Sequence, residues 1–290
     1  MKPLYLVETI TKDKLIHQGI FYKPTKSNGR AILWVHGLTG KFYGDVAIMN
    51  TFAEACDMLG FGFASFNTRG HDMVTGFHTV GVPNRYRTVG AGYEKFEECV
   101  YDIDAAVSFL VSQGFSEVVL VGHSTGANKV CFYAATQKNP HVIGVALSGS
   151  LSDRLDPLVP KEKREKDLSA AKNFIKAGRG NELMFGFHFF PMTPKRYISI
   201  FEAGSTEDTF DYGDAKPKMT YFSQIQLPVM VVLPGADEYA DRPIEDIKKV
   251  FDDHATSKRY HSTIIPGAVH KLHGKESEAA MAICDWVMTI

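Results

Sequence analysis

A serine lies between two glycines in the segment 122–126, which reads Gly-His-Ser-Thr-Gly. The apolar run 118–121 precedes this segment, and a helical pattern over 127–137 follows it. Together they predict a strand, a sharp turn and a helix that present the Ser124 hydroxyl as a nucleophile. Glycine suits both flanking positions because such a turn packs against its neighbours and leaves no space for a Cβ atom.

A serine hydroxyl is a weak nucleophile at neutral pH, so a histidine must accept its proton and a carboxylate must orient that histidine. The best candidate for the acid is Asp237, which closely follows the apolar run 229–233. Glu238 and Asp241 are alternatives. Any of the three could instead cap a helix that begins near Pro243.

The candidate for the general base is His270, which follows the predicted strand 262–265. His273 is its competitor, and the spacing of the two could suit a metal site. No suitable cluster of further ligands accompanies them, so we expect no metal. Other histidines are expected only to pack, form hydrogen bonds or lie at the surface, including His71, His78 and His123.

The attacked carbonyl oxygen becomes negatively charged, so backbone N–H groups should already face it. One should be the amide of Thr125, directly after the nucleophile. The second should be the amide of Leu38, in the His-Gly turn that follows the apolar run 31–35. That turn could also be a tight connection with no chemical role.

The elements that would position these residues alternate along the chain. Short apolar runs are typical of strands buried on both faces, and the helical patterns between them predict a mainly parallel, doubly wound α/β sheet. Ligands of such sheets bind at the carboxyl ends of the strands. Residues 4–10 and 15–22 predict an opening hairpin. The remaining strands are expected at 31–35, 61–66, 118–121, 142–147, 229–233 and 262–265, and helices at 46–59, 96–111, 127–137, 244–251 and 276–288.

One long segment, 151–226, interrupts the alternation with helical patterns but no convincing pair of strands. We interpret it as a cap inserted into a core domain formed by residues 1–150 and 227–290. An aromatic cluster in this segment could be the core of the cap or could line an apolar or aromatic substrate pocket. It comprises Phe185, Phe187, Phe189, Phe190 and Met192.

Composition excludes several classes of protein. The chain has 290 residues, and 32 basic side chains nearly balance 33 acidic ones, so no overall electric field attracts nucleic acid or an anionic membrane. No apolar stretch is long enough for a signal peptide or for membrane insertion, which predicts a cytoplasmic protein. Its partner should be a small molecule, although a homodimer stays open. The four cysteines are far apart and should be buried free thiols.

The motifs together resemble the α/β-hydrolase superfamily across almost the whole chain. They are His-Gly-Leu-Thr-Gly (36–40), Phe-Asn-Thr-Arg-Gly-His-Asp (66–72), the segment 122–126, Asp-Glu-Tyr (237–239) and Pro-Gly-Ala-Val-His (266–270). The His-Ser-Thr sequence and the stretch 170–183 are similar to a group of serine esterases that includes fungal siderophore esterases. This resemblance implies an α/β-hydrolase fold, a catalytic triad of Ser124, Asp237 and His270, an oxyanion hole at Leu38 and Thr125, and no cofactor.

The predicted activity is therefore hydrolysis of a carboxylic ester of a small, uncharged or apolar/aromatic substrate, through an acyl-enzyme on Ser124. The same residues can cleave amides, thioesters, lactones or carbon–carbon bonds. A non-catalytic receptor for a small ligand is a further alternative, although binding alone has no need of a triad. A dinucleotide enzyme is disfavoured because no G-x-G-x-x-G follows the early strand.

Overall fold

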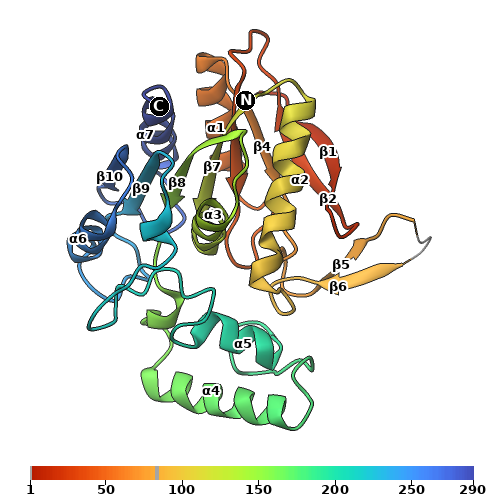
Figure 1. The fold of residues 1–290 in the computed structure, drawn as a ribbon, viewed down its shortest axis with the longest axis vertical. Coiled ribbons are helices and arrows are strands. Elements are labelled where there is room, and N and C mark those ends of the chain that lie inside the picture. Colours follow the sequence, from red (N-terminus) through yellow and green to blue (C-terminus); the bar gives the residue numbers. More distant parts are fainter. Residues whose placement is uncertain (1, 82–84) are drawn as a thin grey trace.

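The computed structural model describes residues 2–81 and 85–290, and in this part of the chain eight strands form one large sheet (Figure 1). Their order is β1-β2-β4-β3-β7-β8-β9-β10. The hairpin β1-β2 is antiparallel and β2 pairs antiparallel with β4, whereas all later pairs are parallel. The strands are β1 (Tyr5–Ile10), β2 (Ile16–Tyr22), β3 (Arg30–Val35), β4 (Gly62–Phe66), β7 (Glu117–His123), β8 (Val142–Ser148), β9 (Val229–Pro234) and β10 (Tyr260–Ile265). The predicted mainly parallel sheet is confirmed.

Helices cover both faces of this sheet, which explains why its central strands are apolar throughout. On one face, α1 (Val46–Leu59) and α7 (Glu276–Val287) bury their side chains against the strands. On the other face lie α2 (Cys99–Ser112), α3 (Thr125–Thr136) and α6 (Ile244–His254). A short 3-10 turn, η1 (Phe96–Glu98), leads into α2. All five helices were expected from the sequence, with ends shifted by only a few residues.

The ends of α1 show how local chemistry sets the boundaries of an element. The side chain of Asp45 accepts a hydrogen bond of 3.1 Å from the backbone N–H of Ile48, which satisfies a donor in the first turn. The helix ends at Gly60, whose φ of 73° lies in the left-handed region that glycine adopts without strain. These two residues give α1 the same bounds as the periodicity predicts.

The segment 151–226 contains two helices, α4 (Lys161–Lys176) and α5 (Pro194–Phe201), and the short turns η2 (Asp153–Leu155) and η3 (Phe222–Gln224). Figure 1 shows α4 and α5 together beyond one end of the sheet. Their apolar side chains form a separate cluster with Met184, Phe190 and Met192. Phe210, Tyr212, Met219, Phe222 and Ile225 instead pack into the main core on the side of α6.

A second, two-stranded sheet was not expected from the sequence. It consists of β5 (Thr75–His78) and β6 (Tyr86–Val89), which project from the body of the molecule (Figure 1). The sequence around His71 and His78 suggests a glycine-rich loop, but the structure places His78 in the strand β5. The four residues of each strand mix polar and apolar side chains or include glycine, so neither carries a clear strand pattern.

The expected cysteine chemistry is confirmed, because Cys56, Cys99, Cys131 and Cys284 are all buried free thiols. In the described part of the chain, none of the helices combines the length and hydrophobicity needed to cross a bilayer. The cytoplasmic location and the homodimer stay predictions.

Candidate active site

Ser124 occupies the sharp turn between β7 and α3. Its φ of 57° and ψ of −131° are unusual for a residue with a side chain, so the fold must hold this turn against strain. Part of the restraint is a hydrogen bond of 2.9 Å from the backbone N–H of Ser124 to the carbonyl of Ser148, at the end of the neighbouring strand β8. Helix α3 begins at the next residue, so the hydroxyl lies at the junction of strand and helix.

The two flanking glycines are required by close backbone contacts. A Cβ atom on Gly122 would lie 2.3 Å from the carbonyl oxygen of Gly126. A Cβ atom on Gly126 would lie 2.1 Å from the carbonyl oxygen of Val35 in β3. Neither space admits a side chain, which confirms the reason given for glycine at these positions.

His270 and Asp237 are hydrogen-bonded to each other. His270 Nδ1 lies 2.7 Å from Asp237 Oδ2, and both side chains are buried. The other oxygen, Oδ1, accepts a hydrogen bond of 3.0 Å from the backbone N–H of Tyr239, which fixes the carboxylate. Because a carboxylate only accepts, Nδ1 carries the proton in this pair, and Nε2 is free to accept another.

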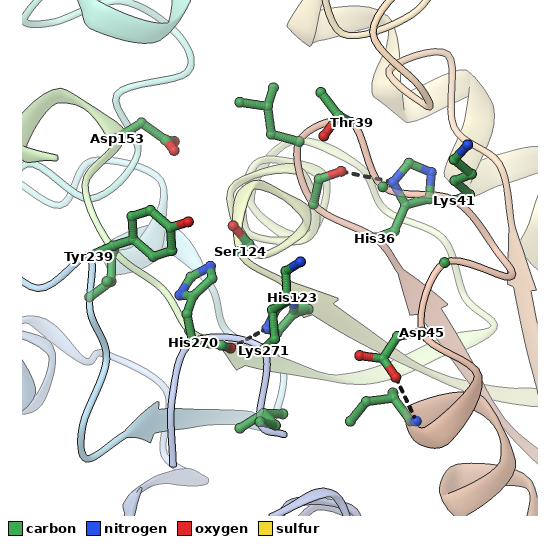
Figure 2. Close-up of a pocket in the computed structure, with 18 of the residues that line it drawn as sticks. His36, Thr39, Lys41, Asp45, His123, Ser124, Asp153, Tyr239, His270 and Lys271 are labelled. Atoms are coloured by element: carbon green, nitrogen blue, oxygen red, sulfur yellow. Dashed lines mark hydrogen bonds between the residues drawn. The ribbon is translucent and has the colours of Figure 1, made fainter. Parts of the chain in front are cut away.

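Ser124 and His270 line the same pocket, which has a volume of about 700 Å³. Figure 2 shows the hydroxyl of Ser124 and the ring of His270 within this pocket. The structure thus brings together three residues from the ends of β7, β9 and β10. A serine hydroxyl, an imidazole and a carboxylate that orients the imidazole are the three groups that nucleophilic catalysis of this kind requires.

The alternative acids and base have other partners. Glu238 Oε2 accepts a hydrogen bond of 2.9 Å from the backbone N–H of His270, and Asp241 pairs with Arg242 at 2.8 Å. No acidic side chain caps α6, because Pro243 stands at its N-cap. His273 contacts Asp45 at 3.2 Å at the rim of the pocket.

The loop after β3 passes directly against Ser124. A Cβ atom on Gly37 would lie 2.7 Å from Ser124 Cβ, so only glycine allows this approach. The next residue, Leu38, lines the pocket, and Thr125 lies at the first position of α3. Within the described residues, the backbone N–H groups of Leu38 and Thr125 have no protein acceptor, so both are free to bind a substrate oxygen.

His36 holds this loop in place as a neutral side chain. Its Nε2 accepts a hydrogen bond of 2.9 Å from the backbone N–H of Thr68, so Nδ1 carries the proton and donates to the carbonyl of Gly37 at 2.9 Å. Burial and the nearby Lys129 ammonium lower the pKa of His36 to about 3. The loop is therefore fixed in one form across the neutral pH range.

His123 is a packing residue, as the sequence suggests. Its ring stacks on Trp34 at 5.6 Å between centroids, and its Nε2 donates to the carbonyl of His270 at 2.8 Å. Burial and the neighbouring His270 lower the pKa of His123 to about 4, so it stays neutral. It supports the backbone of His270.

A family model described as "Protein of unknown function (DUF1749)" matches residues 6–290. The chain belongs to this family. A comparison with the sequences of curated proteins finds no match.

Several solved structures are similar to the DUF1749 chain over nearly its whole length. One, described as "The structure of DcsB complex with its substrate analogue", is 16% identical, with a TM-score of 0.71 and 99% of each chain covered. The siderophore hydrolase EstB from Aspergillus fumigatus is 15% identical, with a TM-score of 0.69, and the match covers 99% of this chain and 98% of that one. Est1E from Butyrivibrio proteoclasticus, solved with ferulic acid bound, is 13% identical, with a TM-score of 0.66 and 98% of each chain covered. These likenesses confirm the α/β-hydrolase fold.

The aromatic cluster of the DUF1749 chain divides between pocket and core. Phe189 lines the pocket, whereas Met192 is fully buried and Phe187 packs against it in the cluster of α4 and α5. Phe185 is largely exposed, and neither it nor Phe187 nor Met192 is among the described residues that line the pocket. The pocket wall from this segment also includes His188, Ile200 and Phe201.

Two further pocket residues of the DUF1749 chain were missed in the sequence. Asp153, in η2, and Tyr239, two residues after Asp237, both line the pocket. Asp153 follows the end of β8 much as Asp237 follows the end of β9. An acidic residue just beyond a strand was therefore the sequence pattern that could have indicated Asp153 as a pocket residue. Among the described residues, no group of three potential metal ligands occurs.

Proposed function

We propose that this protein is a serine hydrolase that cleaves carboxylic esters through an acyl-enzyme on Ser124. The observation that carries the proposal is the hydrogen bond of 2.7 Å that Asp237 forms with His270, which lines the same pocket as Ser124. The sharp turn at Ser124 and the free N–H groups of Leu38 and Thr125 support it further. The structural neighbours named as hydrolases or esterases agree with this class of reaction.

In the proposed mechanism, His270 Nε2 accepts the proton of Ser124 Oγ as that oxygen attacks the ester carbonyl. Asp237 stabilises the imidazolium, and the N–H groups of Leu38 and Thr125 bind the oxyanion. His270 then returns the proton to the alcohol as the ester bond breaks. A water molecule, deprotonated by the same histidine, then attacks the acyl-enzyme. His270 returns this proton to Ser124 Oγ as the acyl bond breaks and the acid is released.

The substrate enters a pocket between the strand ends and the segment that contains α4 and α5. We interpret residues 151–226 as a cap, because His188, Phe189, Ile200 and Phe201 line the pocket opposite the core. Phe189 and Phe201 offer aromatic surface for an acyl or alcohol group. Phe185, Phe187 and Met192 are not part of this proposed substrate wall.

Hydrolysis of 4-nitrophenyl esters, together with labelling by a fluorophosphonate, tests the proposal. We expect the wild-type protein to turn over and to be labelled, and Ser124→Ala to lose both while keeping its thermal unfolding temperature. Ser152→Ala is the matched control, because Ser152 lines the same pocket and should leave both signals unchanged. Turnover by Ser124→Ala at the wild-type rate would refute the assignment.

A panel of matched amide, thioester and lactone substrates tests the preference for esters. Within the esters, acyl groups of increasing length and aromaticity test the role of Phe189. If bulky aromatic esters react best, Phe189→Ala should lower their kcat/KM more than that of acetate esters.

A further inference from the structure

One partly buried charged side chain of the pocket, Asp153, has no partner among the residues that the structure describes. Asp153 lies in η2, is partly buried and lines the pocket that contains Ser124 and His270. Figure 2 shows its carboxylate pointing into the pocket, on the same side as the hydroxyl-bearing ring of Tyr239. Within residues 2–81 and 85–290, no side chain forms a hydrogen bond or an ion pair with this carboxylate, unlike most charged groups around it.

The neighbouring buried charges already balance one another. Arg196 pairs with Glu207 and, at 3.0 Å, with Glu94, while Lys129 lies 2.7 Å from Glu94. These two cations and two carboxylates sum to zero. Asp153 interacts electrostatically with Arg196 and Glu207. Its negative charge is additional to this balanced group of four and is not compensated by it.

Among the described residues, Lys271 also lines the pocket without a side-chain partner, but it is exposed to solvent, whereas Asp153 is partly buried. The remaining charged groups have partners. Lys41 contacts Asp72 at 2.5 Å, and Asp45 contacts His273 at 3.2 Å. Asp156, close to Asp153 in the sequence, accepts a hydrogen bond of 2.8 Å from a backbone N–H.

The ionised form of Asp153 is disfavoured at this position in the pocket wall. Burial and repulsion by Glu207 raise its pKa to about 7, although Arg196 and His270 act in the opposite direction. A cation placed in the pocket would remove this cost, since an opposite charge favours the ionised carboxylate.

We propose that Asp153 binds a cationic group of the substrate, an ammonium or quaternary ammonium carried on the acyl or alcohol part of the ester. The aromatic ring of Tyr239 would provide a second favourable surface for such a group. This inference rests on the proposed esterase function and narrows it. The balanced composition of the chain suggests an uncharged substrate, and this inference departs from that expectation. The overall charge does not report on a single carboxylate in the pocket.

Two pairs of esters, each pair alike in shape, test the proposal. Butyrylcholine and 3,3-dimethylbutyl butyrate place the charge, or its neutral equivalent, on the alcohol. The 4-nitrophenyl esters of 4-(trimethylammonio)butanoic acid and 5,5-dimethylhexanoic acid place it on the acyl group. We expect kcat/KM of the charged ester to exceed that of its neutral partner by at least about tenfold in one pair, as for an ion pair partly removed from water.

Asp153→Asn should reduce this ratio to near one while leaving kcat/KM for the neutral ester within about threefold of wild type. Asp156→Asn is the matched control, because it removes a pocket carboxylate that already has a partner, and it should keep most of the preference. A ratio near one in both pairs for the wild-type protein, or a preference that survives Asp153→Asn, would overturn the inference.

The outcomes separate this inference from the proposed function. Hydrolysis of the neutral esters without any preference for charge refutes only the role of Asp153. If no ester is hydrolysed, calorimetry with Ser124→Ala decides the inference: butyrylcholine should bind about tenfold more tightly than 3,3-dimethylbutyl butyrate, and equal affinities would refute it.

Discussion

The buried charges beside the site make a prediction about stability. Glu94 lies between Lys129 of α3 and Arg196 of α5, at 2.7 and 3.0 Å, and all three side chains are fully buried. Arg196 also donates to the backbone carbonyl of Ala91 at 3.0 Å. The group therefore joins α5 to the helix that begins directly after Ser124.

Replacing Glu94 with glutamine removes one of the two negative charges and leaves two buried cations with only Glu207. Removing one partner of a buried ion pair typically costs about 3–5 kcal/mol, because the remaining charge stays uncompensated in a medium of low polarity. We therefore expect Glu94→Gln to lower the free energy of unfolding by about this amount. Since domains have only about 5–15 kcal/mol in total, the variant should fold but be clearly weakened.

Chemical denaturation followed by fluorescence and circular dichroism measures this loss. The control is Asp253→Asn, which breaks the exposed pair of Asp253 with Lys249 at 2.7 Å and should cost no more than about 0.5 kcal/mol. Glu94→Gln combined with Lys129→Met should recover part of the loss, because the uncompensated charge is then removed. Equal effects of Glu94→Gln and Asp253→Asn would refute the reasoning.

The same group predicts a dependence on pH. Burial alone would raise the pKa of Glu94, but Lys129 and Arg196 outweigh it and hold that pKa below its ordinary value of 4.5. A carboxylate whose pKa is lowered by folding contributes stability above its unfolded pKa and loses it as the pH falls through the folded pKa. The stability difference between wild type and Glu94→Gln should therefore be constant at neutral pH and shrink below about pH 4.5.

Three further predictions concern the pocket. Asp237→Asn should lower kcat for ester hydrolysis by about 10³–10⁴-fold with a smaller change in KM, because the amide no longer fixes the tautomer of His270; retention of the wild-type kcat would contradict this role. Gly149→Ala should lower kcat about tenfold, because Gly149 has a φ of 59° and an added Cβ would lie 3.3 Å from His270 Cε1. A kcat and KM equal to those of wild type would argue against this contact. Asp153→Asn should raise the thermal unfolding temperature above pH 7 but not below pH 4. The reason is that ionisation of Asp153 lowers stability as the pH rises from its ordinary pKa of 3.8 to its raised pKa of about 7, and a temperature shift independent of pH would contradict this.

Much of the fold and part of the candidate site follow from the sequence, because both depend on local patterns. The apolar runs mark the strands of the main sheet, and the segment 122–126 marks the strained turn. Asp237 and His270 could be selected because they follow strands whose carboxyl ends must meet. Their mutual hydrogen bond agrees with that selection.

The features that could not be predicted from the sequence depend on contacts between segments that are distant along the chain. Glu94, Lys129 and Arg196 are separated by tens of residues and resemble ordinary surface charges in the sequence, yet they are buried together. The hairpin β5-β6 has too few residues for a periodic pattern. Phe185 and Phe189 belong to one aromatic run and are both largely exposed, but only the packing of α4 and α5 decides that Phe189 lines the pocket and Phe185 does not.

The relative positions of the candidate site residues depend on the hydrogen bonds between backbone segments more than on any one side chain. The N–H of Ser124 bonds to the carbonyl of Ser148, the N–H of Gly149 to that of Val232, and the N–H of Gly235 to that of Ile265. These three bonds, each of 2.9 Å, connect the ends of β7, β8, β9 and β10 in turn. The distance from the serine to the histidine loop is therefore set by the register of the sheet. A substitution at Ser124 or Asp237 should then remove chemistry while leaving this frame intact, whereas a side chain at Gly149 alters the frame itself.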